Sequence, residues 1–313
     1  MSEKSHGKNS YTKTKHTNTY KRRGTQNRKR ITLSGIILIV LSVLFGGVSF
    51  LRTGTPLPTA ELFDGKPTIR FIDVGQGDCT LITYKGDSVL IDAGPASSGS
   101  NTAAYVYSYA PIVDYFIITH PHEDHMGGAA DILENVYVKN MILNDETSDN
   151  RFYTAAMEAA YERGVNLVYV EPDEPEVFTI GDIKITLLDS GLDDESENED
   201  FNNISLVVRV DVGSTSIMTV GDAESPVESE LLQNYAGDSI LDCDILKVGH
   251  HGSSTSTTEE FLEAVSPEIC VISCGENNSY GHPHRETMEL LNEYGAEIHR
   301  TDKEGTVILR GEQ

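Results

Sequence analysis

THPHEDHMGG, at residues 119–128, follows directly on the apolar run DYFII at residues 114–118. The apolar run is typical of a buried β-strand, and the closing glycines indicate a tight loop. A strand end followed by such a loop directs several side chains at one point, and imidazoles and carboxylates are ligands of zinc and its first-row neighbours. Because three of the ten histidines fall within six residues, the segment predicts a metal site rather than a set of solvated loop histidines. The candidate ligands are His120, His122, Asp124 and His125.

Three later segments place similar side chains after β-rich runs. A lone His or Asp at a strand end is often only a loop residue, so each segment is weak by itself. Their joint occurrence favours one shared centre, in which a carboxylate can bridge two cations. The segments are MTVGDAE (218–224) with Asp222, LKVGHHGSS (246–254) with His250 and His251, and NSYGHPH (278–284) with His282 and His284.

Charge is distributed unevenly along the 313 residues. Residues 1–30 hold 10 Lys or Arg and one acid, a net charge of +9, whereas the rest holds 14 basic and 48 acidic side chains, a net charge of −34. The acidic part argues against a protein that binds nucleic acid by charge alone. The basic part has almost no large aliphatic residues and is predicted to be a disordered tail.

Residues 31–51 (ITLSGIILIVLSVLFGGVSFL) form an uncharged run of 21 residues. As a helix this run spans about 30 Å, the thickness of the hydrocarbon core of a bilayer. Its basic upstream flank predicts a single-pass signal anchor in the cell membrane, with residues 1–30 cytoplasmic and everything after a linker at 52–66 extracellular. The alternatives are a cleaved signal peptide, for which the run is long, and a buried globular helix.

Residues 67–313 are long enough for one substantial core. Some predicted strands follow one another directly, as in hairpins, and others are separated by helices. This order predicts an α/β (α+β) fold with a mixed sheet or two packed sheets and external helices. Gly164 is expected to end the first helix, and Thr257 or Thr258 to cap the third. Strands are predicted within 68–74, 79–84, 88–92, 114–120, 137–143, 182–189, 204–212, 215–222 and 244–250, and helices at 152–164, 226–235, 258–265 and 285–294.

The four cysteines lie in or beside predicted strands and are expected to be buried small apolar residues. A disulfide between Cys79 and Cys243 is conceivable outside the membrane, but nothing in the sequence requires one.

The motifs FIDVGQGDC, HPHEDH, FNNISLVV, TVGDAE, KVGHHGS and YGHPH occur in this order along the chain. In this respect residues 68–313 resemble the metallo-β-lactamase superfamily, and most closely the extracytoplasmic hydrolase domain of ComEC-type competence proteins. The resemblance implies a four-layer αββα sandwich with two metal ions at one edge, between the sheets. Because the chain has only one hydrophobic span, it does not imply a DNA-import pore.

The resemblance also implies which side chains hold the two divalent ions, zinc being favoured. His120 and His122 would hold the first ion and Asp124 and His125 the second, with Asp222 bridging them. The last ligand would be His251 in preference to His250.

One departure from the family pattern concerns the first ion. Where many members supply a third histidine, FNNIS offers Asn202 and Asn203. An amide oxygen is a harder and weaker donor than imidazole, so the first position would be loosely filled or would hold manganese. Asp73 either orients a ligand or caps the turn at residues 75–77, and Asp78 and Asp92 are open in the same way.

The predicted function is that of a membrane-anchored, extracytoplasmic, metal-dependent hydrolase. Paired cations activate water at neutral pH and hold the attacked oxygen. The favoured activity is that of a phosphodiesterase acting on a polymer, either nucleic acid or a cell-envelope polymer. Asp124 would orient the nucleophile, and His250, His282 or His284 would stabilise the leaving group or bind a phosphate oxygen. The alternatives are hydrolysis of an ester, lactone or β-lactam, and a non-catalytic binding module with a retained fold.

Overall fold

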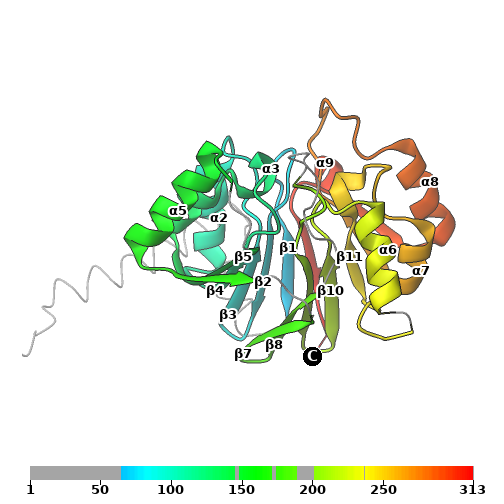
Figure 1. Ribbon diagram of the computed structural model, residues 1–313, viewed down its shortest axis with the longest axis horizontal. Helices are drawn as coiled ribbons and strands as arrows, with labels where there is room; N and C mark the ends of the chain where they lie inside the picture. The colour runs from blue at the N-terminus through cyan, green and yellow to red at the C-terminus, as the bar shows by residue number, and fades with distance from the viewer. Residues whose placement is uncertain (1–64, 145–147, 171–173, 189–200, 236, 313) are drawn as a thin grey trace, which may run out of the picture. The chain divides into compact units, whose positions relative to one another are not determined.

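A computed structural model describes residues 65–144, 148–170, 174–188, 201–235 and 237–312 (Figure 1). These residues form two sheets of seven strands each. In spatial order, the first sheet contains β14 (Val307–Arg310), β1 (Thr68–Phe71), β2 (Thr80–Tyr84), β3 (Asp87–Ile91), β4 (Ile112–Ile117), β5 (Tyr137–Asn144) and β6 (Asn166–Val170). The second contains β13 (Glu297–Arg300), β12 (Ile269–Ile272), β11 (Ile245–Lys247), β10 (Thr215–Thr219), β9 (Val207–Val212), β8 (Ile183–Leu188) and β7 (Glu176–Ile180).

Each sheet has an antiparallel half and a parallel half. Strands β3 to β6 run parallel in the first sheet, and β10 to β13 run parallel in the second. Within a parallel half the carboxyl ends of the strands share one edge, and the loops that follow them gather there.

The core between the sheets is built by alternate strand residues. Val208, Val210 and Val212 of β9 belong to the same apolar cluster as Ile117 of β4. Burying such a side chain contributes roughly 1.5–3 kcal/mol. Because a one-residue slip would turn all three valines of β9 to the other face, this pattern fixes the register of the strand.

Helices cover the outer face of each sheet (Figure 1). Val106, Ile132 and Ala156 pack in one cluster with Phe116 of β4, and on the second sheet Val227, Phe261 and Leu291 pack in one cluster with Leu246 of β11. The layers therefore follow the order helix, sheet, sheet, helix, as predicted. The helices are α2 (Gly99–Tyr109), α4 (Ala129–Asn135) and α5 (Arg151–Arg163) on the first sheet, α6 (Ser225–Asn234), α7 (Glu259–Val265) and α8 (Arg285–Tyr294) on the second, and the short α3 (Glu123–Met126), η2 (Gly249–Gly252) and α9 (Thr301–Glu304).

Local signals set the ends of the predicted helices. The side chain of Asn150 accepts hydrogen bonds from the first turn of α5, and Gly164 ends this helix with a φ of +66°. Thr258, not Thr257, caps α7 and accepts from the backbone N–H of Phe261. These are the ordinary starting and stopping devices of helices.

All four cysteines are free and buried, which confirms the expectation that they act as small apolar residues. Burial raises the pKa of the Cys243 thiol to about 12. Within the described ranges, none of the helices combines the length and the apolar composition needed to cross a bilayer. The predicted tail (1–30) and the predicted transmembrane helix (31–51) lie outside these ranges.

Candidate metal centre

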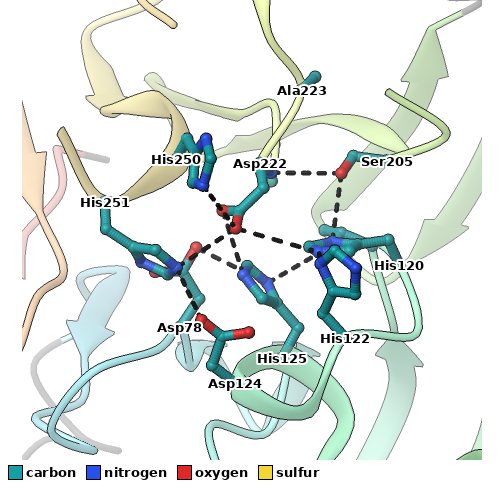
Figure 2. Close-up of polar contacts among 12 residues, drawn as sticks. Asp78, His120, His122, Asp124, His125, Ser205, Asp222, Ala223, His250 and His251 are labelled. Carbon is teal, nitrogen blue, oxygen red and sulfur yellow. Dashed lines mark hydrogen bonds and ion pairs between the residues drawn. The ribbon is translucent and has the colours of Figure 1, made fainter. Parts of the chain in front are cut away.

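Four buried side chains from four loops converge at the edge where the parallel strands end (Figure 2). One ligand atom from each lies within 4.8 Å of all the others. Nε2 of His125 is 3.1 Å from Oδ1 of Asp222. Nε2 of His251 is 3.3 Å from Oδ2 of Asp222 and 3.3 Å from Oδ2 of Asp124, which adds a fifth side chain to the group. The buried four are Asp78, His125, Asp222 and His251.

The two imidazoles are held from behind, so that their Nε2 atoms face the cluster. Nδ1 of His125 lies 2.8 Å from Oδ2 of Asp92, and Nδ1 of His251 lies 3.0 Å from the carbonyl oxygen of Ser273. In metal sites a partner on the second ring nitrogen orients the ring and fixes its tautomer. Asp92 is this partner for His125. The sequence analysis had left open whether Asp92 orients a ligand or caps a turn.

The facing atoms form the kind of donor set that a divalent cation requires. Nε2 of His125, Nε2 of His251 and Oδ1 of Asp222 are buried and have no hydrogen-bond partner among the described residues. Leaving a buried polar atom unsatisfied costs roughly 1–3 kcal/mol. A cation would satisfy all three at once, and the mixture of imidazole and carboxylate suits zinc and other first-row metals.

The electrostatics of the cluster also favour bound cations. Burial alone would lower the pKa of His125 and His251, yet the carboxylates facing them raise both pKa values well above the usual range. Burial alone would raise the pKa of Asp222, and the two rings hold it far below its usual value. Among the described residues, the side chain of Lys247 also lies against this group, in contact with Asp78. Four carboxylates contact the two rings: Asp78, Asp92, Asp124 and Asp222.

The position predicted for the first ion is less complete. Nε2 of His120 and Nδ1 of His122 are 3.0 Å apart, and Nε2 of His120 is 4.0 Å from Oδ2 of Asp222. Burial lowers the pKa of His120 well below its usual value, which keeps the ring neutral and able to bind metal. Ser205 Oγ lies 3.2 Å from Nδ1 of His120, on the side of the ring away from His122.

Neither asparagine clearly replaces the missing imidazole. Oδ1 of Asn203 accepts a hydrogen bond of 3.0 Å from the backbone N–H of Glu224, so this oxygen serves the loop that carries Asp222. Asn202 lines the cavity beside the cluster. The structure thus brings together all six predicted ligands, but only two imidazoles and Asp222 surround the first position.

Comparison with known proteins agrees with this geometry. The family model described as the metallo-β-lactamase superfamily matches residues 72–276. The chain belongs to this superfamily. It is 31% identical over 261 residues to ComE operon protein 3 of Bacillus subtilis, covering 77% of this chain and 33% of that protein, and 30% identical over 252 residues to Recombination protein 2 of Haemophilus influenzae, covering 77% and 29%. The chain therefore spans about a third of the length of these relatives.

Solved structures share the fold at low sequence identity. The metallo-β-lactamase fold protein YhfI from Bacillus subtilis superposes with a TM-score of 0.52 at 14% identity, over 78% of this chain and 100% of that one. The diiron β-hydroxylase CmlA from Streptomyces venezuelae superposes with a TM-score of 0.53 at 14% identity, over 78% and 54%. At this identity the likeness concerns the fold.

The two consecutive histidines after β11 differ in how deeply they are buried. Both have positive φ values, +45° for His250 and +53° for His251, in a backbone region that residues other than glycine rarely adopt. His251 is 1% exposed, whereas Nε2 of His250 lies 3.8 Å from Asp222 Oδ2 and its Nδ1 lies 3.4 Å from Glu224 Oε1. These distances favour His251 as the ligand and leave His250 beside it, on the cavity wall.

His284 lies outside the cluster and does not line the cavity. Its Nδ1 accepts a 2.9 Å hydrogen bond from the backbone N–H of Ser254, and its Nε2 lies 3.3 Å from the carbonyl oxygen of Tyr280. Nδ1 therefore joins this segment to the loop of Ser254, and Nε2 contacts the segment's own backbone. The catalytic role predicted for His284 stays a prediction.

A buried ion pair below the cluster was not predicted from the sequence. Nζ of Lys247 contacts Oδ2 of Asp78, donates a 3.1 Å hydrogen bond to the carbonyl of Gly221, and lies 4.0 Å from Asp222 Oδ1. Burial alone would raise the pKa of Asp78, but Lys247 and His251 lower it to about 2. The available signal was that Lys247, the first residue of KVGHHGS (247–253), stands within the apolar run ILKV at residues 245–248.

A cavity of about 610 Å³ opens directly onto the cluster. Its walls include Gln76, Asn202, Tyr280 and His282, and its floor includes Asp124 and Asp222. No lysine or arginine of the described residues lines it. The cavity can therefore admit a substrate to the ligand set, but it offers no cationic side chain of its own to attract one.

Proposed function

We propose that this chain is a metal-dependent phosphodiesterase that binds two divalent cations, with zinc favoured and manganese the alternative. The observation that supports it is the meeting of two ligand groups at Asp222, which lies within 4.0 Å of both His120 and His251. Cations bound there would activate water at neutral pH and neutralise charge on the attacked phosphoryl oxygen.

The side chains around the cluster have distinct tasks in this proposal. Asp124 is the most accessible carboxylate of the group, with a side chain 26% exposed. Burial alone would raise its pKa, but the nearby rings of His251 and His125 hold its pKa below the usual range. Asp124 remains an acceptor that orients the attacking water. His250, turned by Glu224 and Thr255, is placed to contact the leaving group.

The choice of phosphodiester rests on the relatives. One relative is named for recombination and another for competence, and the backbone bond of DNA, the molecule that recombines, is a phosphodiester. An ester, lactone or β-lactam hydrolase would use the same ligand set and is the second candidate. A binding module with a retained fold is the third, and the unsatisfied buried nitrogens of His125 and His251 argue against it.

The activity is tested with chromogenic substrates on the full chain in detergent. We expect hydrolysis of bis-p-nitrophenyl phosphate with zinc or manganese, and much slower hydrolysis of p-nitrophenyl acetate and nitrocefin. A chelator should abolish the reaction, and metal analysis should find up to two ions per chain. The reverse order of substrates would replace the proposal with the second candidate, and absence of metal would replace it with the third.

We also propose that residues 31–51 anchor the enzyme in the cell membrane, with the hydrolase domain outside and a phosphodiester polymer of the envelope or of nucleic acid as substrate. The charge asymmetry across the apolar run supports this topology. Protease added to intact cells should remove the domain and spare the tail at residues 1–30. Protection of the domain would reverse the topology.

A further inference from the structure

One wall of the cavity is a continuous row of aromatic rings. The loop between β12 and α8 carries Tyr280 and His282, whose rings stack with centroids 5.6 Å apart and planes inclined by 23°. The ring of His282 meets that of His250 edge-on at 5.5 Å. Because His250 Nε2 lies 3.8 Å from Asp222, the row leads from solvent to the metal centre.

The outer ring of this row is exposed, and its middle ring has an unsatisfied nitrogen. Tyr280 is 65% exposed although its ring stacks on His282, so the face turned away from His282 is open to solvent. His282 is only 9% exposed, and its Nδ1 has no hydrogen-bond partner among the described residues. Nε2 of Gln76, a residue that lines the same cavity, is also buried and has no hydrogen-bond partner among the described residues.

The loop that carries the rings is held in place before any ligand arrives. Asn278 donates to the carbonyl of Gly275 at 2.9 Å and accepts from the backbone N–H of His282 at 3.0 Å. At the C-terminal end of the loop, Nδ1 of His284 accepts a hydrogen bond from the backbone N–H of Ser254. Oε1 of Gln76 accepts from the N–H of Gly275 at 3.1 Å, which positions the Gln76 amide beside the loop. A fixed aromatic surface loses little entropy on binding a flat ligand.

Beyond the proposed metal ions, charged side chains do not provide the affinity of this site. The cavity has no lysine or arginine among the described residues, and the chain after residue 30 carries a net charge of −34. Proteins that hold single strands of nucleic acid combine cationic grooves with aromatic platforms, and stacking contributes about 1–3 kcal/mol per base. Because no lysine or arginine lines the cavity, ring stacking is the main interaction that remains besides contact of the phosphate with the proposed cations.

We infer that the open face of Tyr280, backed by the ring of His282, forms a ring-binding subsite that stacks a nucleobase next to the scissile phosphodiester. This inference rests on the proposed phosphodiesterase function and names the part of the substrate that the enzyme recognises. A substrate without rings, such as a glycerol phosphate polymer, would gain nothing from this wall.

The test compares a substrate that has bases with one that has none. For the full, zinc-loaded chain, Tyr280→Ala should raise KM for thymidylyl-thymidine about 10-fold, with kcat little changed, and leave KM for glycerophosphoglycerol within about twofold. Tyr280→Phe keeps the ring and should behave like the unmodified chain. Equal KM changes for both substrates, or no change for the dinucleotide, would overturn the inference.

A binding measurement separates this inference from the proposed function. Calorimetric titration should find that thymidine 5′-monophosphate binds more tightly than glycerol 3-phosphate, and that Tyr280→Ala removes the difference. If neither phosphodiester is hydrolysed, the proposed function fails, while the calorimetric comparison still decides whether the rings bind a base. Equal affinity for the two phosphates refutes the ring-binding subsite whatever the activity.

Discussion

The two predicted metal positions share Asp222 but differ in completeness. The second position has Asp124, His125 and His251 with Asp222, and both of its imidazoles are oriented by oxygen atoms behind them. The first has His120 and His122, with a serine hydroxyl rather than a carboxylate behind His120. Two centres that look equivalent in the motif HPHEDH are therefore unequal in three dimensions.

The difference shows how burial and donor count together set affinity for a cation. At the second position, buried carboxylates raise the pKa of His125 and His251 in the metal-free protein. The carboxylates thus favour a positive charge at this position, which a bound cation would supply. At the first position, burial lowers the pKa of His120, and fewer carboxylates face it. We expect the second position to bind its ion more tightly, and the following changes test that ranking.

The largest effect is expected from the residue that the two positions share. Asp222→Asn keeps the shape but removes the charge that faces both imidazole groups, so bound metal and activity should both fall, activity by about 1,000-fold or more. Metal content after dialysis and hydrolysis of bis-p-nitrophenyl phosphate measure this. Glu162→Gln, an exposed acid on α5 outside the ligand set, is the control. An Asp222→Asn variant with full activity would show that the two positions do not depend on this carboxylate.

A second change tests the support beneath the second position. Lys247→Met leaves Asp78 charged and buried without its partner, which should destabilise the fold by about 3–5 kcal/mol, as seen on breaking buried ion pairs. The double variant Lys247→Met with Asp78→Asn removes both charges and should recover much of that loss. Chemical denaturation of the metal-free and metal-loaded chain measures both. Equal stability of the single and double variants would mean that Asp78 does not depend on Lys247.

The sequence analysis predicted the candidate ligands that lie close together along the chain. His120, His122, Asp124 and His125 share one loop, so their convergence follows from local geometry once a strand is placed before them. The Asp78–Lys247 pair joins the two sheets, and no local pattern links the partners. Its detection requires the packing of one sheet against the other.

The same limit applies to the strands. Strands with long apolar runs, such as β9, were predicted, whereas the edge strands β6 and β7 and the short strands β12, β13 and β14 were not. Most residues of these edge strands are exposed or half-buried, so their composition resembles that of loops. Their pairing with β5 and β8 defines them as strands, and pairing between distant segments leaves little trace in the sequence.

A matched pair of substitutions ranks the two positions directly. His251→Ala should release the more tightly held ion and His122→Ala the weaker one. Titration with a chelator of known affinity should therefore show a loss of the high-affinity ion in the first variant only, with activity falling about 10- to 100-fold in both. His299→Ala, on β13 and outside the cluster, controls for loss of a histidine. Loss of the tight ion from His122→Ala would reverse the ranking.

The smallest expected effect comes from an attempt to complete the first position. Asn202→His offers an imidazole from the segment where many superfamily members supply one, and Asn202 already lines the cavity. The dissociation constant of the weaker ion should fall about 10-fold, because imidazole is the better donor for zinc. Asn203→His serves as the control, since Asn203 Oδ1 is engaged by the N–H of Glu224 and its replacement should loosen that loop without gaining a ligand. If Asn202→His leaves the weaker constant unchanged, the weakness of the first position does not arise from the missing third imidazole. The cause would then lie in the scarcity of carboxylates around His120 and His122, and the two positions would differ by their electrostatic surroundings rather than by their number of donors.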